Sequence, residues 1–464
     1  MKTEKRMIGR QTELDYLEHM YGYEGSQIIV IYGEKHVGKH HLIQTFCKGK
    51  SYLNLSCKDC SENLQMELWC REIESSEQSV TPVERRYDEI FNRILLNYEE
   101  KCVLLIDEFQ LISKNAMHFL SDLSDYIHKM KEGKELFVIL LSSDVNWFEQ
   151  SIPDECEHAA YDFSGVLRIN PLPFSSLREY FSKLSAKDCV QIYSVLGGYA
   201  GLWHFWVPQK SFKENFSALM LNENGMLYRE AGHRMSDLFR EPGAYQTILY
   251  AVANGNIQMN EIHHFTGFTR AKTGVYLNRL IQCSVLSKEK LFNSQASETI
   301  RNGIYRFREP FLMIWYRILF AHLSLLRQMG PSVFYDKMVK PILDELFHYA
   351  FEQCCIEYFE WMNQLKKLPT VYQSYGIYTG KYGMIDLMAE DKRKQRLVCL
   401  FKWSDKEITY EDYKWLQYCC MKEAIIPAVY ELFSIHGFSQ DLITESKKTG
   451  NITLVDVNAL ANKK

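Results

Sequence analysis

The sequence predicts a chain of several domains that opens with an α/β domain built on a mostly parallel sheet. Three apolar runs predict buried strands, at residues 28–32, 103–106 and 137–141. Helical patterns separate these runs, and strands that alternate with helices form parallel sheets. Ligands of such sheets lie at the carboxyl ends of the strands. In this chain those ends carry glycine, acidic and hydroxyl residues, namely Gly33, Asp107, Glu108, Ser142 and Ser143.

Length and composition bound the class of protein. The chain has 464 residues, which suggests about two to four domains. Apolar residues make up 46% and charged residues 24%, a balance that excludes a disordered chain. The formal net charge is −4, so any contact with nucleic acid would need a local basic face.

The start of the chain and its cysteines predict a cytoplasmic protein. Met1–Arg6 runs into polar sequence without an apolar leader, and the 13 cysteines are expected to be free thiols. The most apolar stretch, Phe311–Leu326, is interrupted by Arg317 and is short for a bilayer span. We expect it to be one buried helix, and no membrane role is predicted.

Changes of pattern along the chain divide it into four predicted parts. They are an α/β domain at residues 1–175, a helical lid at 176–240, a winged helix-turn-helix at 241–308 and a C-terminal α+β domain at 309–464. The third part has three short helical patterns followed by a β-like return that ends at Phe307, which is typical of a winged helix. The fourth has a helical segment and then a β-meander between Gly376 and Trp403.

The first strand is followed by a segment that fits a phosphate-binding loop, or P-loop. Its glycines are spaced so that backbone N–H groups can surround a phosphate, and its lysine supplies positive charge. A strand precedes the segment and a helix follows it, as the motif requires. The predicted nucleotide-binding residues are Gly33, Glu34, Lys35, His36, Val37, Gly38, Lys39, His40 and His41.

One position departs from the P-loop pattern. The residue after Lys39 is normally serine or threonine, whose hydroxyl binds Mg²⁺, but here it is His40. Imidazole is a poor ligand for a hard cation that prefers oxygen. Nucleotide binding can survive on the backbone amides and Lys39, whereas efficient hydrolysis, which needs the metal in place, is doubtful.

The second strand ends in the acidic pair Asp107-Glu108, which fits the Walker B pattern. Asp107 would hold Mg²⁺ through water, and Glu108 would act as the catalytic residue that polarises the attacking water. Ser142 or Ser143 is either a sensor of the γ-phosphate or a cap at the end of its strand. Arg168 is either an arginine finger that acts across subunits or, as we favour, an ordinary surface arginine.

The predicted third helix of the winged segment carries the basic residues Arg270, Lys272 and Arg279. A helix of this kind could lie in the major groove of DNA. The alternative is that the module contacts a protein or another domain, as winged helices often do.

The order of these motifs resembles the archaeal-type ATPases, which are related to the AAA+ and STAND NTPases. The similarity is carried by segments before, within and after the α/β domain: Met7–Leu14, Leu105–Gln110, Leu172–Phe174, Leu196–Gly201 and Leu238–Tyr245. Tyr305–Phe311 and Trp315–Arg317 are similar to the signature of a C-terminal domain that accompanies many of these ATPases. Ala200 stands where the family usually has proline.

That C-terminal domain is related to the PD-(D/E)xK nucleases, so the resemblance implies a nuclease-like site. Asp386 matches the first acid and Lys402 the lysine, while Leu400 stands where the second acid belongs. Glu352 is a candidate replacement from the preceding helix. Because leucine cannot bind a metal ion, we expect a degenerate site without nuclease activity.

Together these patterns predict an ATP-binding protein with ATP and Mg²⁺ as cofactors. The favoured function is a nucleotide-dependent switch with weak or absent hydrolysis. A DNA-binding ATPase coupled to the nuclease-like domain and a non-hydrolysing scaffold stay open as alternatives. Partner proteins or self-association are also compatible with the sequence.

Overall fold

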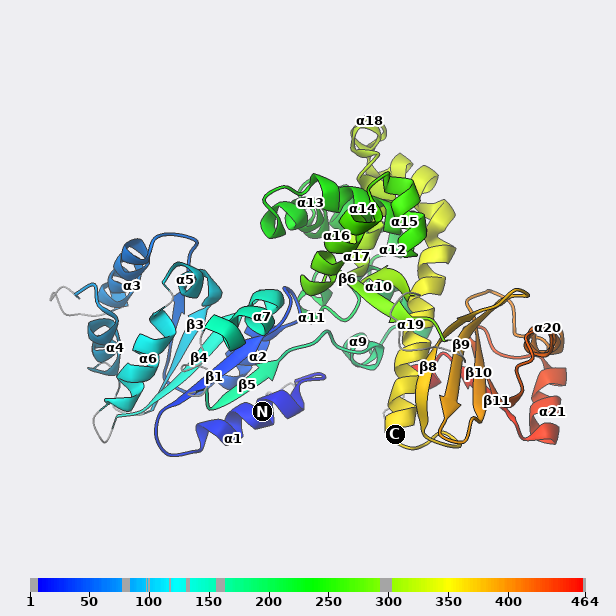
Figure 1. The fold of residues 1–464 in the computed structure, drawn as a ribbon, viewed down its shortest axis with the longest axis horizontal. Coiled ribbons are helices and arrows are strands. Elements are labelled where there is room, and N and C mark those ends of the chain that lie inside the picture. The colour runs from blue at the N-terminus through cyan, green and yellow to red at the C-terminus, as the bar shows by residue number, and fades with distance from the viewer. Residues whose placement is uncertain are drawn as a thin grey trace. The chain divides into compact units, whose positions relative to one another are not determined.

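A computed structural model provides the fold. It describes residues 7–76, 84–96, 98, 101–116, 118–130, 134–155, 163–292 and 303–461. The chain forms two compact units: Met1–Pro171 with Tyr199–Gly201, and Leu172–Gly198 with Leu202–Lys464 (Figure 1).

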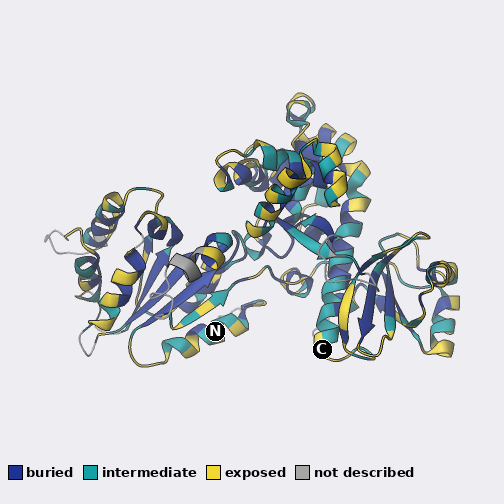
Figure 2. Ribbon diagram, viewed as in Figure 1, coloured by how far each residue is buried: buried dark blue, intermediate teal, exposed yellow. Residues whose placement is uncertain are grey.

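The first unit contains the predicted parallel sheet. Its strands lie in the order β2-β3-β4-β1-β5 and all pair in parallel. Their bounds are β1 Gln27–Tyr32, β2 Tyr52–Ser56, β3 Cys102–Asp107, β4 Leu136–Ser142 and β5 Gly165–Arg168. Strands β1, β3 and β4 are the three predicted from apolar runs, and they are buried along nearly their whole length (Figure 2). The edge strands β2 and β5 were not predicted, because they are short and only partly apolar.

Helices cover both faces of this sheet. They are α1 Gln11–Tyr21, α2 Lys39–Phe46, α3 Glu62–Ser76, α4 Tyr87–Leu96, α5 Gln110–Asn115, α6 Phe119–His128 and α7 Val145–Glu155. One face packs on α1 and α2, where Tyr21 and Phe46 contact Phe137 of β4. The other face forms a core with α3 to α7 around buried residues such as Trp69 and Phe119. Burial of this apolar area stabilises the sheet and fixes the strand ends that carry the site.

The second unit begins with helices and continues into the predicted winged segment. The first group is α9 Phe174–Tyr180, α10 Ala186–Leu196, α11 Ala200–Trp203, α12 Phe212–Phe216, a π-helical turn at Ser217–Leu221 and α13 Met226–Leu238. The next group is α14 Gly243–Ala253, α15 Met259–Thr266, α16 Arg270–Gln282, and the strands β6 Leu286–Lys290 and β7 Gly303–Phe307. The strands β6 and β7 pair antiparallel. The three helices and the hairpin therefore occur where the sequence placed them.

The apolar stretch 311–326 is not the single helix that we expected. It forms α17, Pro310–Ile314, and a π-helical turn at Trp315–Leu319, and a new helix, α18, runs over Leu323–Phe334. The ring of His322 forms a 2.8 Å hydrogen bond with the carbonyl oxygen of Ile318. This bond supplies a partner for a backbone carbonyl at the end of the first helix, where intrahelical donors are lacking. Among the described residues no helix is both long enough and apolar enough to cross a bilayer.

A second five-stranded sheet, in the order β12-β11-β10-β9-β8, forms the C-terminal domain. Its elements are α19 Leu343–Gln364, β8 Tyr372–Thr379, β9 Met384–Asp391, β10 Arg396–Lys402, α20 Tyr410–Lys422, β11 Pro427–Ser434, α21 Gln440–Thr449 and β12 Ile452–Asp456; short turns lie at Tyr335–Val339, Lys340–Ile342 and Ala459–Ala461. The predicted meander is β8-β9-β10, and the parallel half, β10-β11-β12, was not predicted.

The two faces of the C-terminal sheet are covered by different helices. One face packs on α20 and α21 through residues such as Val398 and Leu432. The other packs on α19, where the ring of Tyr358 lies 5.9 Å from that of Phe433. Because these helices lie on opposite faces of the sheet, polar side chains on one face cannot contact those on the other.

A buried ion pair within the second unit gives a test of this fold. Arg234 of α13 donates to Glu309, just before α17, at 2.7 Å, and the side chains are 6% and 1% exposed. We predict that Glu309→Ala lowers the free energy of unfolding by about 3–5 kcal/mol, because a buried guanidinium loses its counter-ion. Thermal and urea denaturation of the full chain measure the change.

The matched control is Glu345→Ala, which removes the 64% exposed partner of Arg317. That change is expected to cost about 1 kcal/mol or less. Equal losses in the two variants would contradict the assignment of Arg234–Glu309 as a structural pair.

Candidate nucleotide site

The loop between β1 and α2 has the backbone shape of a phosphate cradle. His36 and Gly38 adopt left-handed conformations with φ of 64° and 101°. Alternation of right- and left-handed residues turns successive N–H groups toward one point, which makes an anion-binding concavity. Helix α2 begins at Lys39, so its positive N-terminal end faces the same point.

Gly33 is required by the available space. A Cβ atom at this position would lie 2.3 Å from the carbonyl oxygen of Ile169, so no side chain fits. Its own N–H donates to Ser142 at the end of β4. The loop therefore packs closely against the segment just after β5, at the carboxyl end of the sheet.

Lys39 lies over the loop. Its side chain is buried, and Nζ donates to the carbonyl oxygens of Gly33 at 2.6 Å and Glu34 at 2.9 Å. The ammonium group is thus positioned beside the concavity, where it can neutralise phosphate charge.

Two residues outside the loop brace it. Arg10, which is buried, donates to the carbonyl oxygens of Val37 at 3.1 Å and of Asn170, and it pairs with Glu13. Burial lowers the pKa of Arg10. On the other side the hydroxyl of Tyr199 donates to the buried carboxylate of Glu34 at 3.2 Å. The sequence placed both residues in family motifs, but only the structure shows that they contact the loop.

The acidic pair lies at the end of β3. Glu108 has φ of 56°, an unfavourable left-handed conformation for this residue that the surrounding structure must hold. Its Oε2 accepts hydrogen bonds from the hydroxyl of Ser143, at 2.7 Å, and from Gln110. Glu108 is therefore a fixed carboxylate rather than a mobile surface acid. Sequence reasoning did not predict that Ser143 and Gln110 support Glu108.

The contacts of Ser142, Ser143 and Arg168 bear on the alternative roles that the sequence left open for each of them. The hydroxyl of Ser142 accepts from the N–H of Asp144 at 3.1 Å, which is the contact of a cap. Ser143 supports Glu108. Arg168 pairs with Glu149 and lies 5.9 Å from the ring of Tyr32, a local role that favours the surface arginine over the finger.

His40 and Asp107 contact each other directly. His40 Nε2 lies 3.0 Å from Asp107 Oδ2, and this hydrogen bond raises the pKa of the imidazole. The second carboxylate oxygen, Oδ1, is buried and has no hydrogen-bond partner among the described residues. The donor set is thus one nitrogen and one carboxylate, with no hydroxyl after Lys39. These residues do not fit Mg²⁺, which prefers near-octahedral oxygen ligands.

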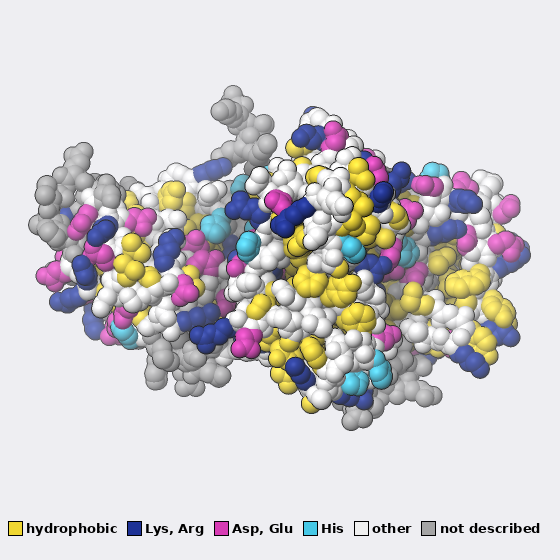
Figure 3. All heavy atoms as spheres, turned by 90° about the horizontal axis from the view of Figure 1, so that it is seen from above, with side chains coloured by type: hydrophobic (Ala, Val, Ile, Leu, Met, Phe, Trp, Pro, Cys, Tyr) yellow, Lys and Arg dark blue, Asp and Glu magenta, His cyan; other side chains and the backbone are white. Residues whose placement is uncertain are grey.

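The basic residues of α16 form an exposed face. Arg270 and Lys272 are exposed, Arg279 is half-buried, and none of the three forms an ion pair with a described residue. Helix α16 contains no acidic residue. Charges of both signs are intermixed over the face of the molecule in Figure 3. Helix α16, which carries basic and no acidic residues, is by its own sequence a local concentration of positive charge.

The predicted nuclease-like residues do not form one group. Asp386 lies on the α19 side, where Glu352 and His348 act on its carboxyl, and burial raises the pKa of Asp386 to about 7. Lys402 instead pairs with Asp412 of α20 at 2.8 Å. Leu400 packs into the core under α20 and α21, and Lys402 follows it two residues later on that face. The sheet therefore separates the lysine from Asp386.

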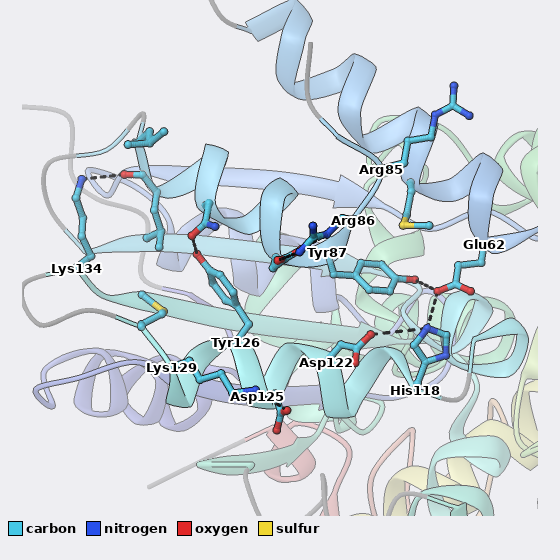
Figure 4. Close-up of a pocket in the computed structure, with 16 residues that line it drawn as sticks. Glu62, Arg85, Arg86, Tyr87, His118, Asp122, Asp125, Tyr126, Lys129 and Lys134 are labelled. Carbon is cyan, nitrogen blue, oxygen red and sulfur yellow. Dashed lines mark hydrogen bonds and ion pairs between the residues drawn. The ribbon is translucent and has the colours of Figure 1, made fainter. Parts of the chain in front are cut away.

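A cavity of 970 Å³ lies beside α4 and α6 in the first unit. Figure 4 shows His118 and Tyr87 directed toward Glu62, and Tyr87 donates to Glu62 at 2.7 Å. His118 Nε2 lies 3.0 Å from the same carboxylate. The described residues that line the cavity include none of the P-loop. Their polar groups bond one another, so the cavity has no evident ligand chemistry.

The parallel sheet and this loop define a P-loop nucleotide-binding domain, and comparisons identify its type. Residues 7–202 match the family described as an ATPase domain predominantly from Archaea. Residues 315–413 match a family described as archaeal and bacterial proteins of unknown function. The chain therefore contains an ATPase domain of the archaeal type at residues 7–202 and a domain of the second family at residues 315–413.

Individual relatives are distant. An uncharacterized protein of Methanocaldococcus jannaschii is 23% identical over 399 residues, which cover 86% of this chain and 88% of that protein. The solved structure of a Walker-type ATPase of Pyrococcus abyssi has a TM-score of 0.50 at 16% identity, covering 67% of this chain and 96% of its own. The ORC2 protein of Aeropyrum pernix, solved with ADPNP and ADP, has a TM-score of 0.45 at 12% identity, covering 70% and 95%.

Buried acids of the second unit predict a pH-dependent stability. Burial raises the pKa of Glu357, Asp386 and Glu431 to about 7 each. The folded chain therefore binds more protons than the unfolded chain between about pH 4 and 7, and the free energy of unfolding falls as pH rises through this window. Urea denaturation at several pH values measures the slope.

Glu431→Gln is expected to reduce that slope, because its amide does not titrate and Oε2 of Glu431 has no hydrogen-bond partner among the described residues. The exposed Glu411→Gln is the control, with an unchanged slope. Stability that rises between pH 5 and 7 in the wild type would contradict the burial of these acids.

Proposed function

We propose that this chain is a nucleotide-dependent switch that binds ATP in the P-loop and hydrolyses it weakly or not at all. The preformed cradle carries the proposal. The left-handed residues His36 and Gly38 shape it, and Lys39 and the N-terminus of α2 supply the positive potential. A polyphosphate tail is the ligand that this combination of close N–H groups and one ammonium group suits.

Weak turnover follows from the surroundings of the acidic pair. Glu108 is held by Ser143 and Gln110 in a position suited to orienting a water molecule. Mg²⁺, the predicted co-ligand, would find the carboxylate of Asp107 but no hydroxyl directly after Lys39, because His40 stands at that position. The chain thus keeps a group for activating water and lacks a group for placing the metal.

The path from nucleotide to the rest of the chain is a short segment. Tyr199–Gly201 belongs to the first compact unit, whereas the residues on both sides of it belong to the second. Tyr199 bonds Glu34, and the N–H of Gly201 donates to the carbonyl oxygen of His36 at 2.7 Å. A nucleotide that favours one shape of the loop would favour one position of this segment, which is the coupling that a switch needs.

DNA binding is a second candidate function, favoured by the exposed basic face of α16. The three helices and the hairpin from α14 to β7 have the element order of a winged helix, in which such a helix enters the major groove. The C-terminal domain would then serve as a degenerate nuclease-like fold that binds rather than cuts. Partner proteins or a second copy stay possible ligands of the same domains, and the free cysteines suit a reducing cytoplasm.

We expect Lys39→Ala to weaken ATP binding at least about tenfold, a loss of about 1.4 kcal/mol, because the buried ammonium group that lies over the loop is removed. Isothermal titration calorimetry of the full chain measures the affinity. Lys48→Ala, at an exposed position just beyond α2, is the matched control and should bind as the wild type does.

Glu108→Gln should leave ATP affinity unchanged and remove whatever turnover the wild type shows. Absence of ATP and ADP binding by the wild type at millimolar concentration would end the proposal. Rapid wild-type turnover would contradict the switch with weak hydrolysis.

For DNA, the double variant Arg270→Glu with Lys272→Glu should bind a duplex much more weakly than the wild type. The slope of log affinity against log salt should fall by about two, because two phosphate contacts are lost. The control, Lys447→Glu with Lys448→Glu, makes the same charge change at exposed positions of α21. Equal losses in both double variants, or wild-type binding that does not depend on salt, would reject α16 as the DNA-binding element.

A further inference from the structure

The contact between His40 and Asp107 has a consequence for the form of nucleotide that the site accepts. His40 is the second residue of α2, directly after Lys39, and its ring reaches across to the end of β3. Nε2 of the ring lies 3.0 Å from Oδ2 of Asp107. The two positions that would together hold a metal ion beside the phosphates are therefore bonded to each other.

This geometry is unfavourable for Mg²⁺ in two ways. The ion takes near-octahedral oxygen ligands at about 2.0–2.1 Å, and an imidazole nitrogen is a poor substitute for the missing hydroxyl. At 3.0 Å the ring and the carboxylate are in direct hydrogen-bond contact, so no water molecule fits between them. Asp107 keeps a single unpartnered oxygen, Oδ1, which is buried.

The phosphate-binding groups, by contrast, are independent of a metal. The cradle depends on the backbone at His36 and Gly38, and Lys39 is held by carbonyl oxygens of the loop itself. Arg10 and Tyr199 brace the loop from outside. None of these contacts is made by the side chain of His40 or Asp107.

We propose that this site binds ATP as the metal-free nucleotide, with the His40–Asp107 pair filling the place of the divalent cation. The inference rests on the proposed nucleotide binding and specifies its ligand. The chain selects free ATP over the magnesium complex, because the ring excludes the ion while the loop, Lys39 and the end of α2 retain the phosphates. Addition of Mg²⁺ then does not tighten binding.

The test compares ATP affinity by calorimetry in excess EDTA and in excess Mg²⁺, with the full chain. The wild type should bind ATP at least about tenfold more weakly in excess Mg²⁺, because the ion in solution competes with the site for the free nucleotide. His40→Thr restores the usual hydroxyl and should bind ATP at least about tenfold more tightly with Mg²⁺ than without it.

His118→Thr is the matched control. His118 also pairs with a carboxylate at 3.0 Å, and its side chain has the same 57% exposure, but it lies in the cavity beside α6. This variant should keep the wild-type preference for ATP without Mg²⁺. A shift in both histidine variants would show that the effect does not come from the P-loop.

Mn²⁺, as a paramagnetic probe of the magnesium position, supplies a measurement that does not depend on any variant. With ATP bound, the wild type should retain no stoichiometric Mn²⁺ after desalting, as followed by electron paramagnetic resonance. Retained Mn²⁺, or wild-type ATP binding that is equal or tighter with Mg²⁺, overturns the inference and leaves the proposed nucleotide binding intact. Failure to bind ATP under both conditions instead overturns the proposed function.

Discussion

The backbone of the loop after β1 is the constraint on which the functional account depends. Gly33 has no room for a side chain beside Ile169, and His36 and Gly38 must turn left-handed for the N–H groups to converge. These conformations are unfavourable for most residues, so the surrounding structure has to hold them. Arg10 does so by bonding the carbonyl oxygen of Val37 from inside the domain.

The same edge of the sheet carries the two features on which the proposed weak hydrolysis rests. Glu108 is held in a strained, hydrogen-bonded position, as a residue that orients water would be. His40 and Asp107, the two residues at the expected metal position, contact each other at 3.0 Å, and we propose that this contact excludes the ion. A site that binds phosphates tightly and holds a metal ion poorly suits a protein that keeps its bound nucleotide without hydrolysing it quickly. In such a protein the nucleotide acts as a structural signal rather than as fuel.

The sequence predicted the parts of the fold with strong local patterns. The strands β1, β3 and β4 are continuous apolar runs, and the P-loop and acidic pair have fixed spacings, so all were found. The strands β2, β5 and β12 were missed because they are short edge strands that are only partly buried. The inner strand β11 was missed because Glu431 interrupts its apolar run. The stretch 311–326 was taken as one helix because apolar composition says nothing about where a helix ends.

Contacts between distant segments were beyond the sequence. That Tyr199 bonds Glu34, that His40 reaches Asp107, and that Lys402 faces α20 are facts of tertiary packing. The last of these explains why a lysine and an acid that match a nuclease pattern in sequence do not form one site. A motif fixes the order of residues along the chain, while the alternation of side chains across a sheet fixes which residues meet.

A structure of the full chain with a non-hydrolysable ATP analogue tests the central claim most directly. The account predicts the β-phosphate within the loop from Gly33 to Lys39, with the ammonium group of Lys39 turned from the loop carbonyls to the phosphates. An analogue bound elsewhere on the chain, or a loop that stays empty at saturating analogue, would contradict it.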